Sequence, residues 1–188
     1  VLIYDIESDP DDQDDFLHGF LLIKRKKNGY LDFINSKYIP ILSTDQNKAK
    51  IWKRINRKFK KYYNWPILHY GETEYLYCCK LAKELGVNEN ELTELKKRFI
   101  DVHLRLKKHW QLPVNSYGLK TIGKFVGFKW REECADGSIA LLWWRQWKSS
   151  RKQNKSPSKN LKKIFEYNHD DCIATWNITK WLMKKDGF

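Results

Sequence analysis

The chain opens with three strand-like segments, and this opening constrains the fold more than any other feature of the sequence. Val1 to Glu7 is apolar and alternating, and Phe16 to Lys26 has the composition of a second strand. Asn28-Gly29 comes after Lys27, a dipeptide typical of a tight turn between antiparallel strands. Tyr30 to Leu42 is predicted as a third strand that ends near Pro40. The sequence therefore predicts an antiparallel three-stranded meander.

Helical periodicity dominates the rest of the chain. The predicted elements are a helix capped by Ser43, Thr44 or Asp45 that runs to Tyr62, a strand over Trp65–His69, a helix over Glu72–Leu85, a helix that starts at Asn88 or Asn90 and reaches Leu106, a loop over Leu112–Ser116, helices over Leu119–Val126 and Ser138–Trp147, a basic loop over Ser149–Lys159, and a last helix capped by Asn160 that reaches Lys185. Ile100–Leu104 fits a short strand as well as a helix, and both remain open. This order predicts an α/β fold in which helices flank a mixed sheet.

Charge is distributed unevenly along the chain. The 188 residues hold 36 Lys and Arg and 23 Asp and Glu, a formal net charge of +13. Seven acids and no basic residue lie between Asp5 and Asp15, so the rest of the chain carries all 36 basic residues against 16 acids, a charge of +20. A basic protein with one acidic cluster favours a nucleic-acid partner together with a cation site. The alternative is a solvated acidic loop on a lysine-rich protein.

Composition excludes several other classes of protein. Hydrophobic residues make up 41% of the chain, which is too many for a disordered protein. No apolar run approaches the roughly 18–20 residues of a membrane span, and no signal peptide is evident, so no membrane partner is expected. Cys78, Cys79, Cys134 and Cys172 lack disulfide or zinc spacing, which predicts reduced thiols and a cytoplasmic location. Because the first residue is Val, we expect a single domain cut from a longer protein.

Asp5 and Glu7 form the first candidate for chemistry. They are two residues apart on a predicted strand, so their side chains point to the same face. Two carboxylates inside a strand are costly unless they are paired or bind a cation. Hard divalent ions such as Mg²⁺ and Mn²⁺ prefer such oxygen ligands. The alternative is a strand end whose acids pair with nearby lysines.

Two later motifs add acids that a fold could bring to the same place. The segment HYGETE lies where a strand ends and a helix begins, a common location for sites in α/β proteins. An acid such as Glu72 is favourable in the first turn of a helix, where the helix dipole is positive. Glu74 is instead assigned to a candidate functional site together with Asp5 and Glu7. Tyr167 and Asp171 are four residues apart on the last helix and share a face, so the hydroxyl can orient a water beside the carboxylate. The alternative is an ordinary polar turn of helix.

Together, these motifs resemble those of a known family. An acid-x-acid strand, an acid after a later strand and Tyr-x-x-x-Asp on the closing helix are similar to the DEDD exonucleases, the DnaQ-like branch of the RNase H-like superfamily. Position 166 is Glu where the His form of that family has His, so the resemblance is to the Tyr form (DEDDy). The chain resembles the YprB-like RNase H-like domain more closely, in the segments YDIESDP, HYGETE, FIDVH, NSYGLKTIGKFVGFKWR, DGSIALLWW and EYNHDDCIAT.

The resemblance implies an RNase H-like fold and a single 3′→5′ exonuclease domain over residues 1–188, of a kind that often accompanies RecB-family nuclease or helicase modules. It implies two divalent ions, Mg²⁺ or Mn²⁺, that support hydrolysis of phosphodiesters with release of 5′-nucleotides. The implied metal-binding acids are Asp5, Glu7, Glu74 and Asp171, and Tyr167 joins them as a catalytic residue. The expected substrate is single-stranded nucleic acid, with DNA favoured over RNA.

The chain departs from the wider family pattern at its second motif. The family usually presents Asn there, followed five residues later by Asp, whereas this chain has His69 and Glu74. The longer carboxylate leaves the choice between Mg²⁺ and Mn²⁺ open. Asp101 matches a recurring acid of the YprB-like subgroup and is assigned an accessory role, with a structural salt bridge as the alternative.

Other residues are candidates for contact with the nucleic acid. Basic runs over Lys48–Lys61 and Arg145–Lys163 fit a phosphate backbone, although lysine runs are usually solvated faces. Tryptophans of the predicted helix over 138–147 can stack on bases, but Trp143 and Trp147 also have the spacing of a helix core. The individual candidates are Ile6, His69, Lys120, Lys124, Trp143 and Trp144.

Two other functions stay open at this point. One is a nucleic-acid-binding module with weak or lost catalysis inside a larger nuclease or helicase protein. The other is an RNase H-like endonuclease. All five signature positions are filled in this chain, which favours the exonuclease.

Overall fold

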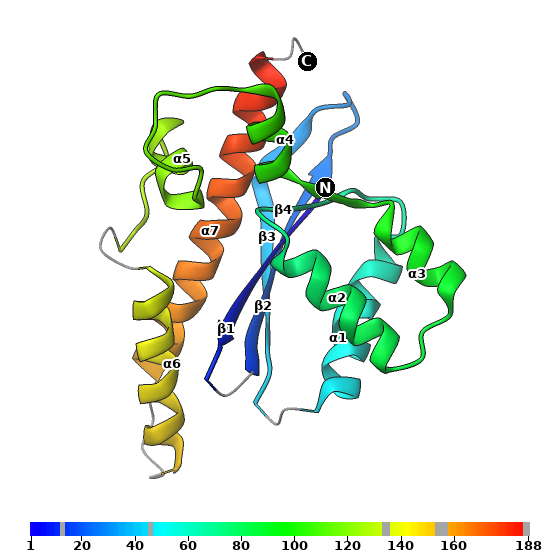
Figure 1. Ribbon diagram of the computed structural model, residues 1–188, viewed down its shortest axis with the longest axis vertical. Coiled ribbons are helices and arrows are strands. Elements are labelled where there is room, and N and C mark those ends of the chain that lie inside the picture. Colours follow the sequence, from blue (N-terminus) through cyan, green and yellow to red (C-terminus); the bar gives the residue numbers. More distant parts are fainter. Residues whose placement is uncertain (12–13, 45–46, 133–135, 153–157, 186–188) are drawn as a thin grey trace.

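A five-stranded mixed sheet lies between two groups of helices in the computed structural model of the chain (Figure 1), which describes residues 1–11, 14–44, 47–132, 136–152 and 158–185. The sheet order is β3-β2-β1-β4-β5. β1, β2 and β3 form an antiparallel meander, whereas β4 and β5 run parallel to β1. The predicted mixed sheet and its meander are therefore confirmed. The strands are β1 (Leu2–Asp9), β2 (Asp14–Arg25), β3 (Leu31–Leu42), β4 (Ile67–His69) and β5 (Phe99–Asp101).

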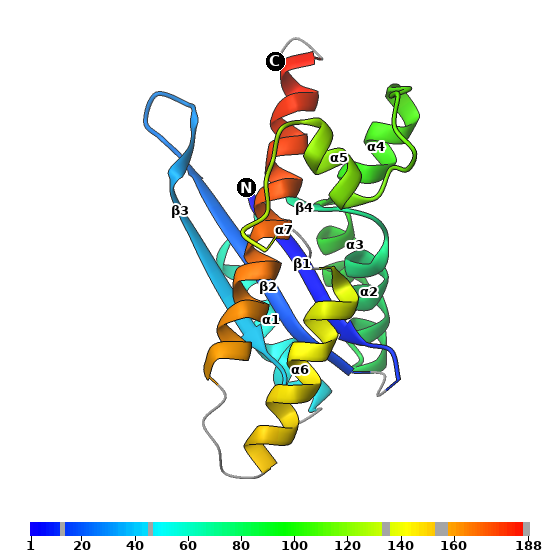
Figure 2. The ribbon, with the colours of Figure 1, turned by 90° about the vertical axis from the view of Figure 1, so that its left-hand side faces the viewer.

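The helices cover the two faces of the sheet unequally. α1, α2 and α3 pack on one face, whereas α7 crosses the other face with α4, α5 and α6 beside it (Figures 1 and 2). β1 lies between the two layers, and its side chains alternate between them. Leu2 and Tyr4 enter the core under α1–α3, whereas Ile3 enters the core under α7. The helices are α1 (Lys48–Lys61), α2 (Thr73–Glu84), α3 (Glu89–Lys96), α4 (Val102–His109), α5 (Leu119–Phe125), α6 (Gly137–Lys152) and α7 (Ser158–Lys185).

Several predicted boundaries are wrong for identifiable reasons. β3 continues past Pro40 to Leu42, because this edge strand has no outer neighbour that would need the missing N–H. Asn47 caps α1 by accepting a hydrogen bond from the Lys50 N–H (2.9 Å), rather than Ser43 or Thr44; Asp45 lies outside the described residues. The open alternatives after Asn88 both occur in part, since a helix, a short strand and a second helix follow each other.

The last two helices also differ from the prediction. α6 continues to Lys152, because no Gly or Pro interrupts the first residues of the predicted basic loop; residues 153–157 lie outside the described part. Asn160 does not cap α7, which begins at Ser158, and instead donates a hydrogen bond from its side chain to Gln146 Oε1 of α6 (3.0 Å). Cys78, Cys79 and Cys172 are free thiols, and Cys134 lies outside the described residues.

A buried histidine lies in the core on the α1–α3 side. The side chain of His18 is fully buried, and its Nδ1 is 2.9 Å from the Tyr4 hydroxyl, which in turn lies 3.7 Å from Cys78 Sγ. The thiol donates to the hydroxyl oxygen, so the hydroxyl donates to the unprotonated Nδ1 of a neutral ring. Burial lowers the pKa of His18 to about 3.

This histidine predicts a loss of stability in mild acid. The ordinary pKa is 6.5, so below that pH the unfolded chain binds the proton and the native chain does not. The contribution of His18 to stability is complete above pH 6.5 and decreases as the pH falls towards 3, by about 2 kcal/mol between pH 7 and pH 5. Urea unfolding of the wild type and of His18→Gln at both pH values should show that the variant loses about 2 kcal/mol less than the wild type. Equal losses would contradict the assignment.

Candidate metal centre

Four acidic side chains from three elements meet at the end of β1. Asp5 and Glu7 come from β1, Glu74 from the first turn of α2, and Asp171 from the middle of α7. Asp5, Glu7 and Asp171 each offer an oxygen within 4.8 Å of the others. Glu74 is 4% exposed and close enough to raise the pKa values of Asp5 and Glu7 by repulsion. The structure therefore brings together the four acids that the sequence motifs single out.

Local structure explains why these acids converge. The period of two along β1 turns Asp5 and Glu7 to the face that α7 crosses, opposite to Tyr4. The pairing of β1 with β2 shifts register directly after Glu7, so the regular strand ends at the site. Glu74 projects from α2 just after the turn at Gly71, whose φ of +97° is one that glycine adopts without strain.

The site holds excess negative charge. Burial and mutual repulsion raise the pKa values of Asp5 and Glu7, and burial raises the pKa of Glu74 to about 8 and of Asp171 to about 6. Oε2 of Glu74 is buried without a hydrogen-bond partner among the described residues. His69 Nδ1 lies 3.9 Å from that oxygen, but burial lowers the pKa of His69, so the ring stays neutral and supplies no charge.

These properties fit a divalent cation. A cluster of buried carboxylates with one unpartnered oxygen is costly for the folded chain alone. The charge of Lys120 lowers the pKa values of Glu7 and Asp171 and compensates only part of the repulsion. Carboxylate oxygens are the ligands that Mg²⁺ and Mn²⁺ prefer, so Asp5, Glu7 and Asp171 are able to hold such an ion, with Glu74 beside them.

Tyr167 lies one turn before Asp171 on α7, as predicted. Its side chain is 7% exposed, and burial together with the nearby acids raises the pKa of the hydroxyl far above its ordinary value. The hydroxyl hydrogen-bonds to Asp171, which lowers the pKa of that carboxyl. Tyr167 therefore remains a protonated donor near the acids and does not serve as a base.

Asn168 is a site residue that the sequence analysis missed. Its side chain is fully buried, and its Nδ2 donates to Asp5 Oδ2 (2.6 Å) and to Glu7 Oε1 (3.2 Å). The Tyr38 hydroxyl donates to Asn168 Oδ1 (2.8 Å), which fixes the orientation of the amide. A Cβ at Gly19, the residue that pairs with Asp5, would lie 1.7 Å from that Oδ1. The only signals in the sequence are the position of Asn168 beside Tyr167 and a lone glycine in an apolar strand.

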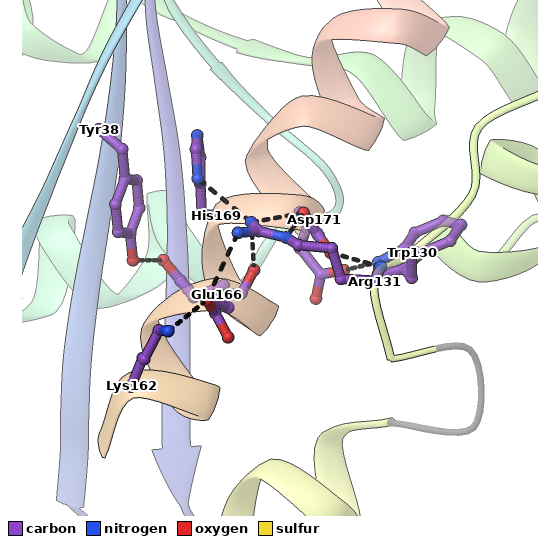
Figure 3. Close-up of polar contacts among 9 residues, drawn as sticks. Tyr38, Trp130, Arg131, Lys162, Glu166, His169 and Asp171 are labelled. Atoms are coloured by element: carbon purple, nitrogen blue, oxygen red, sulfur yellow. Dashed lines mark hydrogen bonds and ion pairs between the residues drawn. The ribbon is translucent and has the colours of Figure 1, made fainter. Parts of the chain in front are cut away.

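The segment after α5 supplies a second set of donors (Figure 3). Trp130 Nε1 donates to Asp171 Oδ1 (2.6 Å). Arg131 donates from its backbone N–H to Asp170 Oδ2 (2.9 Å) and from its guanidinium to Asp170 Oδ1 (2.7 Å). These bonds fasten the segment to α7 and hold the indole against the site. In the sequence, this segment stands out only through its resemblance to the YprB-like domain.

The residues predicted to contact nucleic acid lie in different environments. Trp144 is 1% exposed and stacks on Phe16 and Trp147, so its assignment to base stacking is wrong and it is a core residue. Ile6 packs against the core under α1–α3, and His69 is buried. Of the remaining candidates, Trp143 is half-buried with Lys163 Nζ 5.0 Å from its ring, Lys124 is exposed, and Lys120 Nζ lies 4.7 Å from the Tyr167 ring.

The side chain of Asp101 accepts hydrogen bonds from two backbone segments. Its Oδ1 accepts hydrogen bonds from the Leu104 N–H (3.0 Å), which caps α4, and from the Gly71 N–H (3.1 Å). The second bond fixes the turn that leads to Glu74. Among the described residues, Asp101 therefore acts through backbone hydrogen bonds rather than through the salt bridge considered as the alternative.

A sheet that carries paired acids on its first strand, crossed by a closing helix with a further acid, has the architecture of the RNase H-like class. A family model described as RNase_H superfamily matches residues 2–183. The chain belongs to the RNase H superfamily, whose fold supports a nuclease or other hydrolase and whose nucleases generally use divalent metals.

No curated protein and no solved structure gives a significant match. Among the described residues, none of the helices combines the length and the apolar character needed to cross a membrane.

Removal of one acidic charge should stabilise the metal-free protein. In EDTA at pH 7.5, Asp5→Asn relieves repulsion and should raise the free energy of unfolding by about 1–2 kcal/mol. Millimolar Mn²⁺ should raise the melting temperature of the wild type but not of the variant. Glu72→Gln, which removes an exposed acid outside the cluster, is the matched control and should respond like the wild type. A variant that is less stable in EDTA and still responds to Mn²⁺ would argue against the metal centre.

Asn168 should be energetically coupled to the acids that it contacts. Asn168→Ala removes the donor from buried Glu7 and half-buried Asp5 and should lower the free energy of unfolding by about 2–4 kcal/mol in EDTA. Tyr38→Phe should cost about 1 kcal/mol. The cost of Asn168→Ala should shrink by about 1 kcal/mol in an Asp5→Asn background and stay unchanged in a Glu72→Gln background. Additive costs in both backgrounds would show that Asn168 only fills space.

Proposed function

We propose that this chain is a metal-dependent 3′→5′ exonuclease that shortens single-stranded nucleic acid, with DNA favoured over RNA, and releases 5′-nucleotides. One observation carries the proposal: three buried acids and half-buried Asp5 converge with a protonated tyrosine one helical turn from the last of them. Membership of the RNase H superfamily supports hydrolysis of nucleic acid. The exonuclease direction is supported by the resemblance of these motifs to the DEDDy family.

Each residue of the candidate metal centre has a proposed role. Asp5, Glu7, Glu74 and Asp171 would hold Mg²⁺ or Mn²⁺, which polarises a phosphodiester and lowers the pKa of an attacking water. Tyr167 keeps its proton and orients this water by hydrogen bonding. Asn168 and Trp130 donate to the carboxylates and keep each of them in one orientation.

Charge near the acids supports a polyanionic substrate. Lys120 lies between the rings of Trp130 and Tyr167, with Nζ 4.5 and 4.7 Å from their centres. Half-buried Trp143 packs beside Tyr167, and Lys163 covers its ring. A cation and an aromatic side chain next to the carboxylates suit a phosphate and a base of a single strand. As in YprB-like proteins, we propose that residues 1–188 form one domain that acts beside a RecB-like nuclease or helicase module.

A cleavage assay tests this function. A 5′-labelled 30-nucleotide DNA strand should be shortened stepwise from its 3′ end in Mg²⁺ or Mn²⁺ and remain intact in EDTA. Tyr167→Phe should lower kcat about 10–100-fold with little change in KM, because the hydroxyl acts on the chemical step. Tyr63→Phe, at a tyrosine that is 74% exposed, is the control and should behave like the wild type.

Two outcomes would replace the proposal with its alternatives. Cleavage of a circular single strand would identify an endonuclease. Binding of the oligonucleotide without cleavage that EDTA abolishes would identify a nucleic-acid-binding module.

A further inference from the structure

A second positively charged surface lies away from the metal centre. It consists of the outward side of α1 and one residue of the neighbouring edge strand, and we call it the α1 basic face: Lys37, Arg54, Arg57, Lys58 and Lys61. We propose that the α1 basic face binds the phosphate backbone of a nucleic-acid chain whose end lies at the metal centre. This inference rests on the proposed function for the location of that end, but binding itself does not depend on catalysis.

The composition of α1 is one-sided. Its 14 residues include eight Lys or Arg and no Asp or Glu. The apolar side chains Ile51, Trp52, Ile55 and Phe59 are buried against the sheet, so the charges gather on the outward side. Residues three or four positions apart on a helix are neighbours, which places Arg54, Arg57, Lys58 and Lys61 in one stripe.

The acids of α2 and α3 neutralise only one side of the helix. Lys48 pairs with Glu84 of α2 (2.7 Å), and Lys60 pairs with Glu91 of α3 (3.0 Å). Within the described ranges, no carboxylate lies within 4 Å of a charged nitrogen of Lys37, Arg57, Lys58 or Lys61. The stripe that faces β3 therefore keeps its charge.

This stripe weakens the fold that carries it. Burial and the charges of Lys61, Arg57, Lys37 and Arg54 lower the pKa of Lys58, so these four charges act on its ammonium group. Like charges at these helical spacings destabilise a helix by about 0.2–0.5 kcal/mol per pair. A bound polyanion would remove this repulsion, because each phosphate lies between several cations.

The position of β3 connects the α1 basic face to the metal centre. Neighbouring residues of a strand point to opposite faces of the sheet. Tyr38 points to the α7 side, where it donates to Asn168, whereas Lys37 lies with the cations of α1. The edge strand of the sheet thus separates the two surfaces (Figure 2). A strand that ends at the acids and passes over this edge would reach the α1 basic face.

The chemistry of the face favours nucleic acid over a lipid surface. None of the exposed large hydrophobic side chains of the described residues belongs to α1, so the helix has nothing to insert into a bilayer. The groups available are ammonium and guanidinium ions, which contact phosphates and do not distinguish bases. We therefore expect binding that is independent of sequence, sensitive to salt and dependent on length.

Anisotropy titrations in EDTA test the proposal with labelled single-stranded DNA of 30 and of 6 nucleotides. The triple variant Arg57→Gln/Lys58→Gln/Lys61→Gln should bind the 30-mer about tenfold more weakly at 100 mM salt, and its slope of log K against log salt should be smaller by about 2. Its affinity for the 6-mer should match that of the wild type. Lys107→Gln/Lys108→Gln/Lys184→Gln removes the same charge from α4 and the end of α7 and should leave both affinities within twofold of the wild type.

The outcomes separate this proposal from the proposed function. If both triple variants weakened binding of the 30-mer equally, or if neither weakened it, the proposal for the α1 basic face would be overturned. Loss of binding to vesicles of anionic phospholipid, with unchanged binding of the 30-mer, would assign the face to a membrane and also overturn it. A wild type that binds the 30-mer through this face but cleaves nothing in Mg²⁺ or Mn²⁺ would refute the exonuclease alone.

Discussion

The mutual repulsion of four carboxylates, three of them buried, is the constraint on which the rest of this structure depends. Asp5 and Glu7 come from β1, Glu74 from α2 and Asp171 from α7. The charge of Lys120 offsets only part of their repulsion, and the His69 ring beside Glu74 is neutral. Such a cluster raises the free energy of the folded chain unless other groups take up its charge. Much of the surrounding architecture serves to keep the acids together until a cation binds.

Neutral donors provide the first part of this compensation. The two N–H groups of Asn168 bridge Asp5 and Glu7, and the indole of Trp130 holds Asp171. These contacts lower the repulsion without adding a positive charge that would compete with a metal ion. They also impose steric demands on distant positions, since Asn168 is able to reach the acids only because residue 19 has no side chain. A local electrostatic requirement thus fixes the packing between α7 and β2.

The range over which each structural rule acts explains which site residues could be predicted from the sequence. Asp5 and Glu7 follow from the period of two in a strand, and Tyr167 and Asp171 follow from the helical repeat, because both rules act within one element. Asn168 was missed because its partners belong to other elements and its sequence context is ordinary. Trp144 was misassigned for the opposite reason: the pattern shows an aromatic residue on a helix, but only the packing of α6 on α7 and β2 shows that it is buried.

The acidic segment at the start of the chain is not one functional unit. Asp5 and Glu7 belong to the candidate metal centre, whereas Asp9 is 1% exposed and accepts two hydrogen bonds from Arg145 of α6, at 2.6 and 3.1 Å. This ion pair ties α6 to the end of β1, and α6 in turn places Trp143 beside Tyr167. Asp9, to which the sequence assigns no role, therefore positions the surface around the candidate metal centre. Because Arg145 pairs with Asp9, this carboxylate adds less negative charge beside the candidate metal centre.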